Sequence, residues 1–242
     1  MDTAAWQAYF EHNRDRAPAF VPVSPAKATA PVDPELLAAI ARSLQRFHLG
    51  EAGEGRVAHE ARMSDDPALD AAAREAVDLY VREEGRHARE LAGLLAAMGS
   101  HTLPRHWSER LFRRGRRLLG LRTKMLTIAS AEVVGIVFYG LLRDHGPTAE
   151  IRRLGEVVGR DEVMHLAFQA EWFAHAIEVA DPRVRALVAA GLGAEAAVIL
   201  AAAVLVFALD HGGTLNTLGV RRRDAIVACL RVAGEALAGV RA

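Results

Sequence analysis

The sequence predicts an all-α protein built around a four-helix bundle, with an N-terminal arm and additional C-terminal helices. Between its prolines, apolar residues recur at spacings of three and four, and no segment shows convincing strand alternation. Short loops at 63–66 and 144–147 favour two antiparallel helix pairs, and a longer connection at about 99–122 joins them. Three helix starts carry the Asp-Pro signature, at Asp33-Pro34, Asp66-Pro67 and Asp181-Pro182.

The chain divides into three predicted parts. Residues 1–33 hold a short helix and an arm, where the closely spaced Pro18, Pro22, Pro25 and Pro31, followed by Pro34, disfavour regular structure. Residues 34–179 form the bundle, and residues 180–242 form further helices packed on it. The periodicity places helices at about 3–13, 34–62, 67–98, 123–144, 148–179, 183–209 and 222–239.

Composition narrows the function classes. The chain has 242 residues and a formal net charge of +0, so nucleic acid is not an expected partner. The single Cys229 excludes an intrachain disulfide and a Cys-rich zinc site. The N-terminus lacks a signal-peptide pattern, so a cytoplasmic location is expected. The apolar run Ala196–Leu209 is too short to span a bilayer, so we predict a buried core helix and no transmembrane segment.

Each of the four predicted bundle helices carries a carboxylate on an otherwise apolar face. The candidates are Glu51, Glu84, Glu132 and Glu162, and two helices add a histidine one turn later, in the motifs Glu84-x-x-His87 and Glu162-x-x-His165. A Glu-x-x-His pair places both side chains on one face of a helix. The single glutamates precede the motif glutamates by 33 and 30 residues, which is a weak internal repeat.

Four buried carboxylates would destabilise a purely structural core, because an uncompensated charge in an apolar interior is costly. Two divalent cations would neutralise them. Four glutamates and two Glu-x-x-His histidines form the known pattern of ferritin-like di-iron and di-manganese proteins. The sequence therefore predicts a dinuclear metal site formed by Glu51, Glu84, His87, Glu132, Glu162 and His165.

Residues 34–179 resemble the ferritin-like di-iron carboxylate superfamily. The segment FHLGEAGEGR is similar to the first-helix motif of rubrerythrins and demethoxyubiquinone hydroxylases, and EEGRHAREL and RDEVMHLAF resemble the second- and fourth-helix motifs. The resemblance implies two iron ions, with manganese or a mixed Mn/Fe pair as alternatives. It also implies two ligand groups, bridged by Glu84 and Glu162. One group is Glu51, Glu84 and His87; the other is Glu132, Glu162 and His165.

Several neighbouring residues have open roles. Glu54 is an additional ligand, an outer proton carrier or an arginine-paired carboxylate. Tyr80 and Tyr139 are redox-active groups or, more ordinarily, packed tyrosines with hydrogen-bonded hydroxyls. Asp161 either orients a ligating histidine of a neighbouring helix or is a solvated charge.

Two further features have no assigned role. Glu195 is either a buried, paired acid or part of a lid over a substrate pocket. The basic stretch around residues 106–124 could bind an acidic partner, although a solvated face is the simpler interpretation.

The leading functional hypothesis is an oxygenase or oxidase that uses dioxygen to oxidise an organic substrate. The alternative is a ferroxidase, a peroxide scavenger or another metal-handling protein without an organic substrate. The expected partners of the enzyme are dioxygen and a small-molecule substrate, with an electron-donor protein and a second copy of the chain as further candidates.

Overall fold

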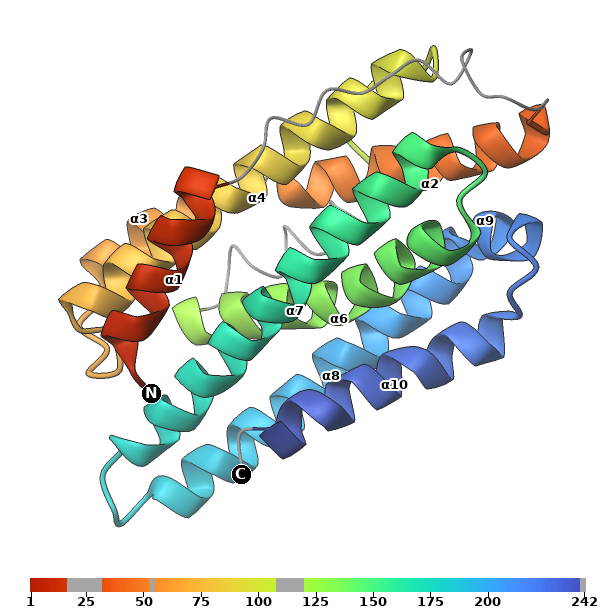
Figure 1. Ribbon diagram of the computed structural model, residues 1–242. Coiled ribbons are helices and arrows are strands. Elements are labelled where there is room, and N and C mark those ends of the chain that lie inside the picture. The colour runs from red at the N-terminus through yellow and green to blue at the C-terminus, as the bar shows by residue number, and fades with distance from the viewer. Residues whose placement is uncertain (17–31, 53–54, 108–119, 240–242) are drawn as a thin grey trace.

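The computed structural model describes residues 1–16, 32–52, 55–107 and 120–239, and every regular element in these ranges is a helix (Figure 1). The all-α prediction is therefore confirmed. The helices are α1 Thr3–Arg16, α2 Pro34–Glu51, α3 Gly55–Met63, α4 Ala71–Ala97, α6 Leu121–His145, α7 Ala149–Glu178, α8 Arg185–Asp210, α9 Gly212–Thr217 and α10 Arg222–Gly239.

The bundle consists of two helix pairs. Helices α2 and α3 pack against α4, and α6 packs along α7, while α4 contacts α7 across the bundle. The crossover was predicted at about 99–122, between α4 and α6, and its residues 108–119 lie outside the described part of the chain. This arrangement places the four predicted carboxylates on four different helices that face one interior.

The predicted helix at 34–62 is wrong as a single element, because the chain forms α2 and α3 instead. Helix α2 ends at Glu51, and the N–H of Ala52 donates to the carbonyl of His48 as its C-cap. Gly50, Gly53 and Gly55 surround the break, and glycine is among the poorest helix formers.

Two of the three Asp-Pro helix starts are displaced. Asp33 caps α2 by accepting from the N–H of Glu35, as predicted. Helix α4 begins later than expected, because Asp70 rather than Asp66 caps it, through the N–H of Ala73. Helix α8 begins at Arg185, after a turn in which Asp181 accepts from the N–H of Arg183. The short helix α9 was not predicted.

Helix α1 covers one side of the bundle. It lies along α4 (Figure 1). Its Trp6 packs against Phe168, and its Phe10 packs against Tyr80. The indole N–H of Trp6 also donates to Glu171 on α7, at 2.9 Å. The N-terminal helix is thus tied to both α4 and α7.

The C-terminal helices lie on the opposite side of α6 from this covering helix. Helix α8 packs against α6, and α10 contacts α6, α7 and α8 (Figure 1). Ala196–Leu209 is not the fully buried helix that we predicted: one side, including Val204 and Phe207, is buried, whereas Val198 and Leu205 are exposed. The exposed side of this segment is apolar as well, because Ala196–Leu209 contains no polar residue.

Within the described ranges, α6 and α8 are long and apolar enough to cross a membrane by length and composition. Most of the apolar window of α6 is buried inside the bundle, whereas most of that of α8 is not. The buried state of α6 is that of a core helix. The absence of a transmembrane segment stays a prediction for α8.

A glycine permits the close approach of α6 and α7. A Cβ atom added at Gly155 would lie 2.5 Å from the carbonyl oxygen of Tyr139 and 2.5 Å from the backbone nitrogen of Arg143. The role of Gly155 is therefore helix packing. Backbone atoms cannot move aside as a flexible side chain can.

We expect Gly155→Ala to destabilise the fold by about 1–3 kcal/mol through overpacking. Gly140→Ala on α6 is the matched control, since a Cβ there meets nothing within 4 Å. It should be stabilising by roughly 0.5–1 kcal/mol because alanine is the better helix former. Urea unfolding of the two variants checks the contrast, and equal stabilities would contradict it.

Candidate metal centre

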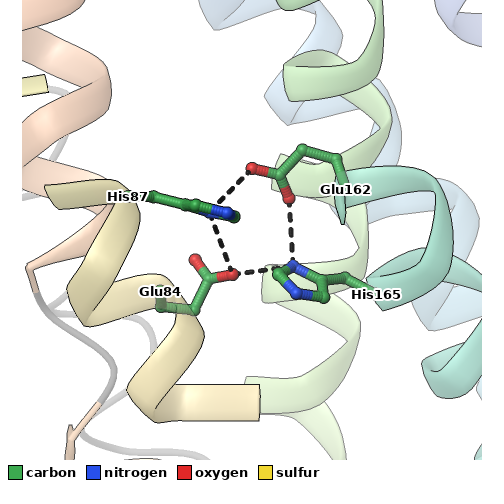
Figure 2. Close-up of side chains that lie close together, drawn as sticks. All are labelled: Glu84, His87, Glu162 and His165. Carbon is green, nitrogen blue, oxygen red and sulfur yellow. Dashed lines mark hydrogen bonds and ion pairs between the residues drawn. The ribbon is translucent and has the colours of Figure 1, made fainter. Parts of the chain in front are cut away.

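The two Glu-x-x-His motifs face each other across the bundle. Glu84 and His87 project from the middle of α4, and Glu162 and His165 project from the middle of α7 (Figure 2). Each motif lies on the buried face of its helix because its members are one turn apart. All four residues are at most 4% exposed, and one donor atom from each lies within 4.8 Å of every other.

The Nδ1 atoms of both histidines point at the glutamates. His165 Nδ1 lies 2.8 Å from Glu84 Oε1 and 3.3 Å from Glu162 Oε2. His87 Nδ1 lies 3.5 Å from Glu162 Oε1 and 3.8 Å from Glu84 Oε1. Glu84 and Glu162 thus contact both histidines, which is where bridging carboxylates would have to lie.

Glu51 and Glu132 flank this group on opposite sides. Glu51 Oε2 is 3.7 Å from His87 Nδ1, and Glu132 Oε1 is 4.0 Å from His165 Nδ1. The structure therefore brings all six predicted ligand residues together, and it associates Glu51 with His87 and Glu132 with His165. This division agrees with the two ligand groups that the family resemblance implies.

The residues fit a pair of cations. Three buried atoms that face the centre, Glu51 Oε2, Glu84 Oε1 and His87 Nδ1, have no hydrogen-bond partner. Buried polar atoms rarely stay unsatisfied in folded proteins. Carboxylate oxygens and imidazole nitrogens without competing donors are the ligands that iron and manganese accept.

Each flanking glutamate is fixed by a tyrosine. The hydroxyl of Tyr139 donates to Glu51 Oε1 at 2.9 Å, and that of Tyr80 donates to Glu132 Oε1 at 2.7 Å. Gln169 also donates to Glu132 Oε1, at 3.2 Å. Both tyrosines are fully buried, so they match the packed, hydrogen-bonded alternative and also orient candidate ligands.

Each histidine is held by an acid from the opposite helix. His87 Nε2, on α4, lies 3.4 Å from Asp161 Oδ2 on α7. His165 Nε2, on α7, lies 3.1 Å from Glu83 Oε2 on α4. An acceptor at Nε2 keeps the proton there and leaves Nδ1 free to bind a metal. Asp161 is thus placed to orient a histidine, the first of the two roles considered from the sequence.

Sequence reasoning missed Glu83, although a signal was present. An acid directly precedes each motif, giving Glu83-Glu84-x-x-His87 and Asp161-Glu162-x-x-His165. The repeated pattern is therefore one residue longer than Glu-x-x-His. Arg86 connects the two acids, because its Nη2 donates to Asp161 and to Glu83 at 2.7 Å each. Asn13 of α1 also donates to Glu83.

The electrostatics reflect the crowding of acids. Burial, followed by repulsion from the other glutamates, raises the pKa values of Glu84 and Glu162 well above the usual range. Burial alone would raise the pKa of Asp161 as well, but hydrogen bonds with His87 and Arg86 outweigh it and lower that pKa. Without cations, the anionic forms of Glu84 and Glu162 are therefore destabilised, whereas the anionic form of Asp161 is stabilised.

Replacing the outer acids should weaken metal binding without removing a ligand. We expect Asp161→Asn and Glu83→Gln each to lower metal affinity by roughly 10- to 100-fold. A neutral amide accepts the hydrogen bond from the histidine Nε2–H more weakly than a carboxylate does. Glu156→Gln is the control on α7, since Glu156 is exposed and pairs with Arg153. Competition with a coloured chelator measures the affinities, and wild-type affinity in both variants would contradict the assignment.

An apolar cavity of about 160 Å³ adjoins the candidate ligands. Four of the six, Glu51, Glu84, Glu132 and Glu162, form part of its wall. The remainder of the wall comes from α2, α6, α8 and His211, which follows α8. It consists of Arg46, Phe47, Gly50, Thr127, Ile128, Ala131, Val134, Gly135, Ala203, Val206, Phe207 and His211.

Other residues considered from the sequence lie away from the centre or outside the description. Glu54 lies outside the described residues, as does most of the basic stretch. Arg122, at the end of that stretch, forms an ion pair with Asp66, at 2.7 Å. Glu195 is half-buried on α8, accepts a hydrogen bond from Thr123 and is not part of the cavity wall, so it matches neither alternative fully.

Comparison with known proteins supplies a fold but no close relative. The sequence matches no protein-family model, and no curated protein matches it significantly. A solved structure of a Synechococcus protein with aldehyde deformylating oxidase activity superposes with a TM-score of 0.62. The alignment covers 86% of this chain and 94% of that chain, at 21% sequence identity. The chain therefore has a ferritin-like fold.

Proposed function

We propose that this protein is a dimetal oxidase or oxygenase that uses dioxygen to oxidise a small, largely apolar organic molecule. The observation that carries the proposal is the apolar cavity whose wall includes four of the six candidate ligands. A cavity of this kind is typical of a small-molecule site, and a centre that only oxidises iron has no need of it.

Glu51, Glu84, His87, Glu132, Glu162 and His165 would hold the two metal ions. Iron is favoured by the resemblance of the motifs, and manganese or a mixed pair would accept the same donors. When bound, a pair of reduced ions would supply the electrons and binding positions that dioxygen reduction needs. Further reducing equivalents would come from an external donor, such as an electron-donor protein.

The side chains of the protein would orient the metal ligands and exclude water from the cavity. Tyr80 and Tyr139 hold the two flanking glutamates, and Asp161 and Glu83 hold the two histidines. Phe47 and Phe207 line the cavity, so a bound substrate would displace water from the side of the glutamates. Aldehydes are the first substrate class to test, because the similar Synechococcus protein has aldehyde deformylating oxidase activity.

Iron turnover distinguishes this function from that of a ferroxidase. An oxidase of organic molecules keeps its two irons, so ferrous iron added beyond two equivalents per chain should not be oxidised faster than in buffer. The absorbance of ferric product follows the reaction. Rapid oxidation of tens of equivalents, with ferric mineral retained by the protein, would favour the ferroxidase alternative instead.

A further inference from the structure

A polar cluster formed by residues of α2 and α9 and by His211 adjoins the cavity. His211, between α8 and α9, is part of the cavity wall and is 7% exposed. Its Nδ1 lies 2.9 Å from Ser43 Oγ on α2. Ser43 Oγ lies 2.7 Å from Thr214 Oγ1, which in turn lies 2.7 Å from the carbonyl oxygen of Ala39. None of these residues belongs to the metal centre.

The order of donors in this chain of contacts is fixed by counting protons. A carbonyl oxygen can only accept, so the single hydroxyl proton of Thr214 goes to Ala39. Ser43 must then donate its own proton to Thr214, because no other proton lies between those two oxygens. The remaining contact requires His211 to donate from Nδ1 to Ser43. Three short contacts thus use three protons, one from each side chain.

The tautomer of His211 follows from this order. The ring lies among Phe47, Phe138 and Phe207, with centroid distances of 5.1, 5.8 and 5.3 Å. Burial there, together with the nearby positive charge of Arg46, lowers the pKa of His211 to about 3, so the ring is neutral. A neutral imidazole with its proton on Nδ1 has a lone pair on Nε2.

No described residue satisfies that lone pair. Ser43 engages Nδ1, and no hydrogen bond to Nε2 is formed within the described part of the chain. Phe47 contacts both His211 and Tyr139, with centroid distances of 5.1 and 5.3 Å, and the hydroxyl of Tyr139 holds Glu51. His211 and the glutamates are thus part of the wall of the same cavity.

We propose that His211 is a specificity-determining residue whose Nε2 accepts a hydrogen bond from an O–H or N–H group of the substrate. The proposal rests on the proposed function and adds a substrate class: small molecules with an apolar body and a hydrogen-bond donor. The donor would be held at His211, so the apolar part lies toward the glutamates. A cavity of about 150 Å³ in another protein accepts benzene, so a one-ring molecule is the right size.

Two isomeric probes test the acceptor. Benzyl alcohol and anisole have the same atoms and similar shape, but only benzyl alcohol has an O–H donor. Binding to the metal-free protein in the presence of chelator, followed by NMR titration, avoids coordination of the probes to metal. We expect about a three- to tenfold preference for benzyl alcohol, which is the usual contribution of a neutral hydrogen bond.

Thr214→Val should reverse the donor order with little change of shape. Valine cannot accept from Ser43, so Ser43 would donate to His211 Nδ1 and the histidine proton would move to Nε2. The preference for benzyl alcohol should then disappear. His211→Phe, which retains an aromatic ring without an acceptor, should lose the preference as well and serves if the valine variant is unstable.

Nitrogen-15 chemical shifts of His211 report the tautomer directly, independently of binding. We expect an unprotonated Nε2 in the wild type and an unprotonated Nδ1 in Thr214→Val. A protonated Nε2 in the wild type, a failure to bind either probe, or an equal preference in all three proteins would overturn the proposal. These readouts need neither iron nor turnover, so ferroxidase behaviour would contradict the proposed function while leaving this result intact.

Discussion

Protein reconstituted with ferrous iron is expected to hold two metal ions per chain, and the Glu132→Ala variant about one. Glu132 is the ligand candidate that α6 contributes, and it lies on the His165 side of the cluster, at 4.0 Å from Nδ1. Its loss leaves one ligand group with only His165 and shared carboxylates, while the Glu51 and His87 side stays intact. Elemental analysis after removal of loosely bound iron gives the count.

Tyr80→Phe is the matched control for this variant. It removes the hydrogen bond to Glu132 Oε1 but leaves the carboxylate in place. We expect it to retain two ions per chain with a weaker affinity for one of them. At most one ion in the wild type would show that the dinuclear assignment is wrong, whatever the variants do.

Removal of the metals is expected to destabilise the fold strongly. A ligand that binds only the native state stabilises it by roughly 4 kcal/mol when its free concentration is about a thousand times its dissociation constant. For a chain of this length, that corresponds to a fall in melting temperature of roughly 10 °C on chelation. Calorimetry with and without chelator measures the difference, and equal melting temperatures would contradict a buried metal site.

A double variant separates metal loss from charge repulsion. Glu84→Gln with Glu162→Gln replaces the two central carboxylates by neutral amides of nearly the same shape. The pKa values of both groups are raised by burial and then by neighbouring glutamates, so the metal-free wild type bears a cost that the amides avoid. We expect the double variant to melt above the metal-free wild type and to respond little to added metal.

The bundle could be predicted from the sequence, and candidate ligand residues could be selected from it, because both depend on local periodicity. A spacing of three or four residues along a helix is enough to place Glu84 with His87, and Glu162 with His165, on one face. The free-energy cost of burying four carboxylates then favours a shared metal site, since isolated buried charges are rarely tolerated. These arguments require no knowledge of how the helices are rotated against one another.

Features that depend on contacts between distant segments were not predictable in this way. The pairing of Glu83 with His165 is set by the relative rotation of α4 and α7. The cavity depends on which side of α8 faces α6, and the fully apolar sequence of Ala196–Leu209 has no polar side to indicate it. Likewise, the break after Glu51 depends on a glycine-rich stretch whose helical periodicity continues across it.

The exchange of acids between α4 and α7 also bears on how the protein opens. The contacts of Glu83 with His165 and of His87 with Asp161 join positions 82 and 74 residues apart, one in each helix pair. Neither helix pair on its own can present a histidine with its acid in place. Local opening of one pair would therefore release a histidine in the other, so the central turns of α4 and α7 should exchange their amide hydrogens as a single cooperative unit.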